Sequence, residues 1–503
     1  MDVLQNLLVG FTNALTPMNI LFCFLGVIVG TAVGILPGLG PAATIAMLLP
    51  LTFGLDPATA MIMMAGIYYG AMYGGSITSI LINTPGESSS VATTFDGYPL
   101  ACKGKAGAAL GMAMIASMIG GTLSIIGLTL ISSPLASFAL KFGPPEYFSL
   151  MFLGLVTLTF LAEASMTKAL LMGCFGLFLS TIGIDVLTGA GRFTFNKLEM
   201  MNGINFIIVA MGLFALGEVL SNLQNKEQNT SSLNFVKHQL KVPLKEVFTK
   251  WRSCLRGSII GFIVGVLPGA GATIASFMSY AAEKKISKRS REFGTGALEG
   301  VAVVESANNA ATGGSMVPLL TLGVPGSAVT AIMLGALMMY GLRPGPLLME
   351  QQPIFVWTVI ASMYLGNLML VLINLPLIPL FASILKVPYS ILYILILVFT
   401  TIGVYSINNS MFDLWLLLVF GVMGYLLRKG KFPLAPVVLS LVLGPMMEQN
   451  LRNSLKMSHG SLVIFFERPI SCILIIISLL LLFLPIAINI FKMIKKNHFI
   501  KLS

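Results

Sequence analysis

Charged residues are scarce in this 503-residue chain. Asp, Glu, Lys and Arg together make up 10% of the sequence, whereas hydrophobic residues make up 56%. Soluble domains carry about 25% charged residues, so this composition excludes an ordinary soluble protein and favours a polytopic membrane protein. The hydrophobic residues come in long runs rather than in alternation, which predicts membrane helices and not a membrane barrel.

Cysteine and histidine are also rare. The five cysteines are scattered without metal-binding or redox spacing, and the three histidines fall in polar loops or in the C-terminal tail. We therefore expect no metal site and no cofactor. An intramembrane enzyme would need His, Asp or Glu clustered at membrane depth, so we expect no catalytic residue and no enzymatic activity.

The net charge of +11 resides in loops between apolar segments. It is typical of the positive-inside bias of cytoplasmic loops and does not indicate nucleic-acid binding. Each apolar segment is near the length of about 20 residues that crosses a bilayer, and together they predict about 10 to 12 crossings. The predicted segments are 18–36, 58–82, 107–132, 147–163, 168–188, 203–222, 298–323, 354–380, 388–406, 412–427, 433–448 and 469–491.

A Gly/Pro-rich signature occurs twice. Residues 34–40 read GILPGLG, and residues 265–271 read GVLPGAG. A Gly-Gly-Ser and then a Pro-Gly follow in each half, at 74–76 and 85–86 and again at 313–315 and 325–326. Helix breakers at corresponding places of two hydrophobic halves are the best sequence indication of a transporter binding site. The alternative is that these glycines only allow close helix packing.

The charge around the two signatures predicts their topology. Residues 257–282 are uncharged and have basic residues on both sides, so both flanks are expected in the cytoplasm. The segment is too short for two crossings, which need about 40 residues, and we expect a re-entrant hairpin. Residues 1–102 contain no Lys or Arg. This opposite bias favours two inverted-topology repeats over a parallel duplication.

The predicted fold is an all-α polytopic membrane protein of two inverted repeats with broken helices and re-entrant hairpins. The first repeat covers 1–222, and the second covers 257–503 together with C-terminal membrane helices. Residues 223–256 form a basic cytoplasmic linker. Its apolar stripe predicts a helix in the membrane interface, with a disordered linker as the alternative.

Backbone groups are the expected ligands of the substrate. A free Lys or Arg at the bilayer midplane is costly, whereas the N-termini of broken helices offer N–H groups to an anion. Glycine permits both the unusual backbone angles and a close approach of the ligand. Tyr68, Tyr69 and Tyr73 precede the first Gly-Gly-Ser and either line the site or pack in the core. The predicted substrate-binding residues are Gly38, Gly40, Asn83, Gly86, Ser88, Gly269, Gly271, Asn308, Asn309, Gly326 and Ser327.

A coupling cation would need oxygen ligands. Glu305 begins the run Glu305-Ser306-Ala307-Asn308-Asn309 within an otherwise apolar segment. An ionisable residue at membrane depth indicates function by default. We predict coupling-ion residues Asn83, Glu305 and Asn308 for Na⁺ or H⁺. The alternative is that Glu305 lies at the interface and only favours the start of a helix.

Several runs resemble the large membrane subunit of tripartite tricarboxylate transporters. They are AGIYYGAMYGGS at 65–76, NTPGE at 83–87, FDGYPLA at 95–101, the stretch 305–327 and GLRPGP at 341–346. Val303-Val304 stand where the family pattern leads us to expect Ala-Pro, which leaves the polar cluster intact. The resemblance covers nearly the whole chain and several long motifs match in order.

The resemblance implies a multi-pass permease of the bacterial inner membrane. It implies as partners a small four-helix membrane subunit, a periplasmic solute-binding protein and a carboxylate such as citrate. Uptake in that family is driven by a cation gradient, and the chain has no P-loop for ATP. The predicted function is therefore secondary active uptake of tricarboxylates or related carboxylates. A passive anion channel or an exporter with the same site is the alternative.

Overall fold

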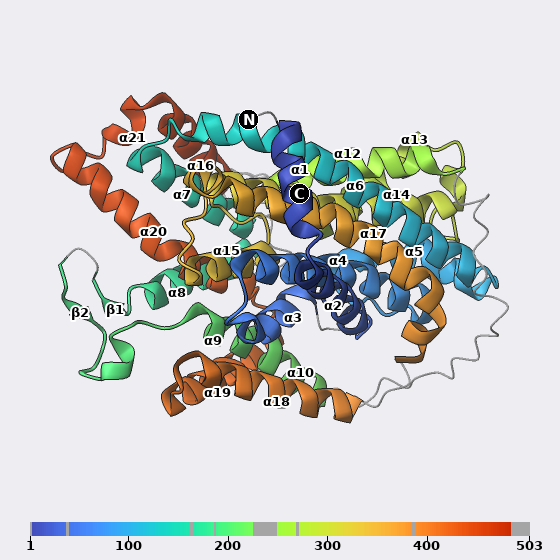
Figure 1. Cartoon of the computed structure of the whole chain (residues 1–503), viewed down its shortest axis with the longest axis horizontal. Coiled ribbons are helices and arrows are strands. Elements are labelled where there is room, and N and C mark those ends of the chain that lie inside the picture. The colour runs from blue at the N-terminus through green and yellow to red at the C-terminus, as the bar shows by residue number, and fades with distance from the viewer. Residues whose placement is uncertain are drawn as a thin grey trace, which may run out of the picture.

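Helices make up nearly all of the described chain (Figure 1). The computed structural model describes residues 3–36, 40–160, 165–185, 188–224, 249–267, 271–384 and 389–483. Within these residues the one sheet is a short antiparallel hairpin of β1 (Gly183–Ile184) and β2 (Gly191–Arg192). The hairpin projects beyond the helices at the left edge of Figure 1.

The first half of the chain holds ten α-helices among the described residues. They are α1 (Val3–Ala14), α2 (Pro17–Gly34), α3 (Pro41–Leu48), α4 (Pro57–Ile82), α5 (Val91–Cys102), α6 (Ala106–Ala139), α7 (Pro144–Phe160), α8 (Met166–Ser180), α9 (Phe206–Ala210) and α10 (Gly217–Gln224). Four short helical turns accompany them: η1 (Leu49–Thr52), η2 (Ser88–Ser90), η3 (Leu198–Met200) and the π-helical η4 (Met211–Leu216).

The second half is also built of helices. Its helices are α12 (Trp251–Val266), α13 (Gly271–Ile286), α14 (Leu298–Leu322), α15 (Ala328–Met339), α16 (Pro346–Gln351), α17 (Pro353–Ile384), α18 (Tyr389–Asn408), α19 (Met411–Lys429), α20 (Ala435–Met457) and α21 (Ile464–Glu467), with the turn η6 (Ser290–Glu292) and a last apolar helix over Pro469–Phe483. Most of the predicted linker helix falls at 225–248, outside the described residues.

Length and hydropathy identify this as a multi-pass membrane protein. Five helices in the described part of the chain are long and apolar enough to cross a bilayer, and several shorter apolar helices accompany them. The prediction of an all-α membrane protein is therefore confirmed. The predicted count of 10 to 12 crossings stays a prediction.

Small residues allow α2 and α4 to pack backbone against backbone. A Cβ on Gly30 would lie 2.4 Å from the Ile67 carbonyl oxygen, far inside van der Waals contact. Such close approach of helices through glycines spaced four residues apart is characteristic of membrane proteins. The facing pairs are Gly26 with Met63, Gly30 with Ile67 and Gly34 with Ala71.

The second half repeats this arrangement with α12 and α14. A Cβ on Gly261 would lie 2.2 Å from the Ala307 carbonyl oxygen. The facing pairs are Gly257 with Val303, Gly261 with Ala307 and Gly265 with Ala311. In both halves the partners advance together along the sequence, so the two helices of each pair run in the same direction.

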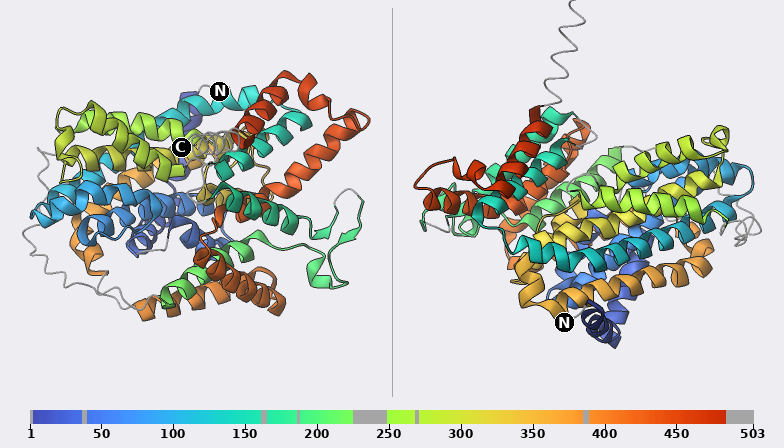
Figure 2. Two further views of the ribbon diagram at one scale, coloured as in Figure 1. Left: turned by 180° about the vertical axis from the view of Figure 1, so that it is seen from behind. Right: turned by 90° about the horizontal axis from the view of Figure 1, so that it is seen from above.

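Parallel pairing requires the intervening chain to turn back. α3 lies between α2 and α4, and α13 lies between α12 and α14. Each must return the chain to the end of the helix pair at which the first helix began. The pairs α2–α3 and α12–α13 are thus helical hairpins, in which the first helix ends at Gly34 or Val266 and the second begins at Pro41 or Gly271. The right-hand view of Figure 2 shows α12 and α13 side by side.

Each half is fastened to the hairpin of the other. The Asp96 carboxylate on α5 accepts hydrogen bonds from the backbone N–H groups of Gly294, Gly296 and Ala297 at 2.8–2.9 Å, in the connection between α13 and α14. Reciprocally, the Tyr340 hydroxyl after α15 donates to the carbonyl of Thr52 at 2.8 Å, between α3 and α4. These hydrogen bonds hold the hairpin of each half against the other half of the chain.

Candidate functional site

The long helices α4 and α14 end in the same way. Asn83 closes α4 with a φ of 55°, and Gly323 closes α14 with a φ of 70°. The left-handed conformation ends a helix and favours glycine or asparagine. Each helix end is followed by the Pro-Gly of its half, which redirects the chain into a short helix.

Glycine is required at these redirecting turns. A Cβ on Gly86 would lie 2.2 Å from the Gly34 carbonyl oxygen, at the broken end of α2. A Cβ on Gly326 would lie 3.1 Å from the Gly265 carbonyl oxygen and 2.9 Å from the Cβ of Ser315. The Pro-Gly turn of each half therefore packs against the break of its own hairpin.

Four helix N-termini converge on one cavity of about 830 Å³. The first turns of α3, η2–α5, α13 and α15 all line it. The volume lies within the usual range of small-molecule sites, about 300–1,000 Å³. Of the predicted substrate residues, five line this cavity: Gly40, Gly86, Ser88, Gly271 and Ser327.

Hydrogen bonds join the two halves across the cavity. The hydroxyls of Ser88 on η2 and Thr273 on α13 lie 2.8 Å apart. The Tyr68 hydroxyl on α4 lies 3.4 Å from the hydroxyl of Ser327, the N-cap of α15. These contacts place polar groups from both halves around the same space.

The helix N-termini give this cavity positive electrostatic potential. The N-terminus of a helix carries about half a positive charge, together with free N–H groups. Several such termini aimed at one space stabilise a carboxylate without a buried lysine. One wall is different, since Glu87 also lines the cavity. An anion in this space would therefore lie near a carboxyl group.

A second polar cluster surrounds Glu305. Glu305 is fully buried in α14, and its carboxylate accepts hydrogen bonds from the hydroxyls of Ser76 at 2.7 Å, Thr93 and Ser117. Glu87 lies near this cluster, since a Cβ on Gly75, the residue before Ser76, would lie 3.1 Å from the Glu87 side chain. No Lys or Arg of the described chain forms a hydrogen bond or ion pair with Glu305. The carboxylate is thus held by hydroxyls from α4, α5 and α6 alone.

Unpartnered amides adjoin this carboxylate. Asn308 is fully buried, and both polar atoms of its side chain lack a hydrogen-bond partner among the described residues. The Asn309 side chain donates to Ser117 at 2.7 Å, whereas its oxygen is also unpartnered. Leaving such groups unpaired costs about 1–3 kcal/mol each. A bound cation or water would satisfy these oxygens.

The remaining predicted residues lie elsewhere. Asn83 is exposed at the end of α4, and Gly326 is buried in the packing beside Gly265; neither lines the cavity. Gly38 and Gly269 fall outside the described residues.

Sequence reasoning missed the basic residues of the cavity. Arg428 at the end of α19 and Lys431 just after it both line the space. Arg428 is paired with Glu218 of α10, while its Nε is buried without a hydrogen-bond partner in the described chain. The sequence predicts backbone N–H groups together with Asn and Ser side chains as ligands, but no basic side chain. The signal was present as a cluster of basic residues directly after the predicted segment 412–427, but nothing in the sequence places that loop beside the hairpins.

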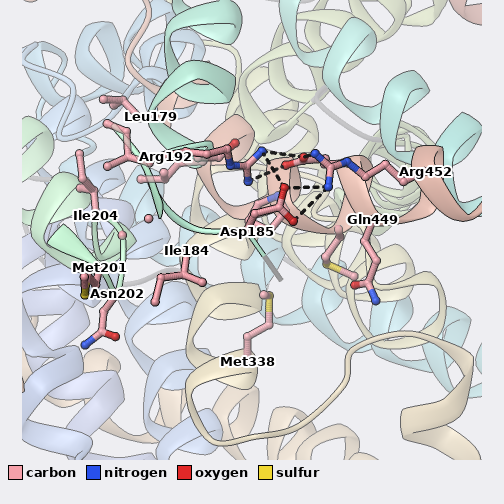
Figure 3. Close-up of a pocket in the computed structure, with 18 residues that line it drawn as sticks. Leu179, Ile184, Asp185, Arg192, Met201, Asn202, Ile204, Met338, Gln449 and Arg452 are labelled. Atoms are coloured by element: carbon pink, nitrogen blue, oxygen red, sulfur yellow. Dashed lines mark hydrogen bonds and ion pairs between the residues drawn. The ribbon is translucent and has the colours of Figure 1, made fainter. Parts of the chain in front are cut away.

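A second cavity, of about 350 Å³, lies next to the β1–β2 hairpin (Figure 3). It contains two arginines, but both are neutralised. Arg192 pairs with Glu448 at 2.8 Å, and Arg452 pairs with Asp185 at 2.8 Å and with Glu448 at 2.7 Å. Two cations facing two carboxylates leave no net charge for an anionic solute, so this cavity does not compete with the first as an anion site.

Broken helices whose ends meet at one cavity, in a mostly helical multi-pass protein, define a component of a membrane transporter. The chain belongs to the tripartite tricarboxylate transporter TctA family, whose model matches residues 20–439.

Two relatives come from Agrobacterium vitis. An uncharacterized 52.8 kDa protein in the TAR-I ttuC' 3' region is 49% identical over 490 residues, which is 95% of each chain. An uncharacterized protein in the TAR-II ttuC' 3' region is 49% identical over 216 residues, 43% of this chain and 89% of that protein. No solved structure matches the chain.

Proposed function

We propose that this protein is the permease subunit for uptake of tricarboxylates or related carboxylates across the bacterial inner membrane. The observation that carries the proposal is the convergence of four helix N-termini on one cavity. That arrangement suits a multiply charged carboxylate, because it supplies positive potential and free N–H groups on several sides. The membership of the TctA family supports the same substrate class.

The proposed architecture is a pair of inverted repeats. Two contacts support opposite directions of α4 and α14. Tyr68 approaches Ser327, whose neighbour Gly326 packs against Ser315 of α14. Ser76, further along α4, donates to Glu305, further back along α14. Residue numbers that rise on one helix and fall on the other indicate antiparallel helices. Matching hairpins in opposite directions are characteristic of alternating-access transporters.

The proposed driving force is a gradient of Na⁺ or H⁺. Glu305 supplies the carboxylate, and Asn308 supplies an unpartnered oxygen beside it. Glu87 lies between this cluster and the cavity, because it lines the cavity and packs against Gly75 beside Ser76. A cation bound here would offset the negative charge next to the substrate, so binding of the two would be mutually favourable.

The proposed partners are a small four-helix membrane subunit and a periplasmic solute-binding protein. Family membership supports this, since the family belongs to tripartite transporters. The function can be tested in inner-membrane vesicles that contain the chain with these partners. We expect labelled citrate to accumulate under a Na⁺ or pH gradient and to be released when an ionophore collapses it. Equilibration without accumulation would instead establish the passive channel.

A further inference from the structure

The connection between α19 and α20 closes one side of the main cavity. Lys431, Phe432 and Leu434 of this connection line the same space as the hairpin ends. The connection belongs to neither hairpin, so this side of the cavity is formed by residues outside the two Gly/Pro-rich signatures.

Lys431 occupies a backbone position that normally takes glycine. Its φ is 55°, its N–H donates to the Arg428 carbonyl at 2.8 Å, and the N–H of Phe432 donates to the Leu427 carbonyl at 2.9 Å. This is the Schellman ending of a helix, in which the left-handed residue is usually Gly. A lysine there is strained relative to glycine, although Gly430 stands one position earlier. Strain at a cavity wall points to a role for the side chain.

The Lys431 side chain is exposed at the cavity and has no partner. Its ammonium group makes no hydrogen bond, ion pair or ring contact with any residue that the structure describes. The neighbouring basic groups are engaged: Arg428 pairs with Glu218, and Lys429 lies over the ring of Tyr425. Lys431 is therefore the free cation of this wall.

Lys168 anchors the loop that carries Lys431. Lys168 on α8 donates to the Gly430 carbonyl at 2.5 Å, and its ammonium lies 4.7 Å from the centre of the Phe432 ring. Both contacts flank Lys431 in the sequence. They fix the backbone on both sides of Lys431 in the sequence and do not engage the Lys431 side chain.

We propose that Lys431 binds a second carboxylate of the substrate while the helix N-termini bind the first. This inference rests on the proposed function. It assigns Lys431 the role of selecting di- and tricarboxylates over monocarboxylates, because a solute with one carboxylate can occupy only one of the two places. Arg428 is paired with Glu218 and leaves Lys431 to supply the charge.

The test is the KM for labelled citrate in vesicles that hold the complete transporter. A hydrogen bond to a charged group contributes enough that Lys431→Ala should raise this KM about tenfold or more. Lys431→Arg should keep it near the wild-type value. Lys429→Ala is the matched control, because Lys429 lies two residues before Lys431 and does not line the cavity. This variant should also leave the KM for citrate unchanged.

Lys431→Gly separates binding from folding. Glycine relieves the left-handed backbone, so its melting temperature should equal or exceed that of the wild type while its KM rises as in Lys431→Ala. Competition by acetate, a monocarboxylate, should be the same in wild type and variants. An unchanged citrate KM in Lys431→Ala and Lys431→Gly would overturn the inference, whereas a wild type without any citrate uptake would overturn the proposed function itself.

Discussion

Replacement of Glu305 by glutamine tests whether the buried cluster couples transport to a cation. Glutamine keeps the size of the side chain but cannot bind or release a proton, and it binds Na⁺ far more weakly. The hydroxyls around Glu305 can accept as well as donate, so they can rotate to suit an amide. Carrier exchange of carboxylate should persist, while accumulation against a gradient should be lost.

The cost to stability follows from the contacts. Ser76 and Thr93 form the closest hydrogen bonds to Glu305, and Ser117 lies farther away at 3.5 Å. In Glu305→Gln, two charge-assisted hydrogen bonds become neutral ones, and each change costs about 1 kcal/mol of stability. Removal of a buried charge partly offsets this cost. Glu305→Gln should therefore shift stability by no more than about 2 kcal/mol. Glu305→Ala leaves a cavity and unpaired hydroxyls, and should cost about 3–5 kcal/mol.

The assay compares accumulation with counterflow in the same vesicles, and thermal unfolding of the purified chain gives the stability. Glu299→Gln is the matched control. Glu299 lies in the first turn of the same helix but pairs with Lys250 at 2.7 Å, so its loss should leave coupling intact. If Glu305→Gln accumulated labelled citrate as the wild type does, the coupling role of this cluster would be refuted.

Three further predictions concern the helix packing and the cavity. Gly30→Ala and Gly261→Ala each place a Cβ 2.2–2.4 Å from a facing carbonyl oxygen and should each cost about 1–3 kcal/mol in thermal unfolding; unchanged melting would contradict the close helix pairing. Gly40→Val meets no atom within 4 Å of the new Cβ, so melting should stay near the wild type while citrate uptake falls, and normal uptake would remove Gly40 from the site. Asp96→Asn turns the three hydrogen bonds that Oδ1 accepts from backbone N–H groups from charge-assisted into neutral ones, so unfolding should be easier by about 2–4 kcal/mol. A wild-type melting temperature would show that these hydrogen bonds contribute little to stability.

The sequence was informative wherever chemistry is local. Hydrophobic runs predicted the helices, and the repeated glycines and prolines predicted where they break. Gly40, Gly86 and Gly271 line one cavity, in agreement with the expectation that matched breaks in two halves meet, while their role in substrate binding stays a prediction.

Other features depend on packing that no local pattern encodes. Lys431 looked like one more positive residue of a cytoplasmic loop until the structure placed its loop against the hairpins. The fastening of α5 by Asp96 needs three backbone N–H groups about 200 residues away, which only tertiary structure brings together. Asn83 appeared polar and available, yet its left-handed backbone serves to end α4.

An experimental structure of the chain with bound citrate tests the central claim most directly. The account predicts density for the anion between the first turns of α3, α5, α13 and α15, with Lys431 directed at it. Citrate bound only in the Arg192–Arg452 cavity, or no density in the main cavity at saturating citrate, would contradict it.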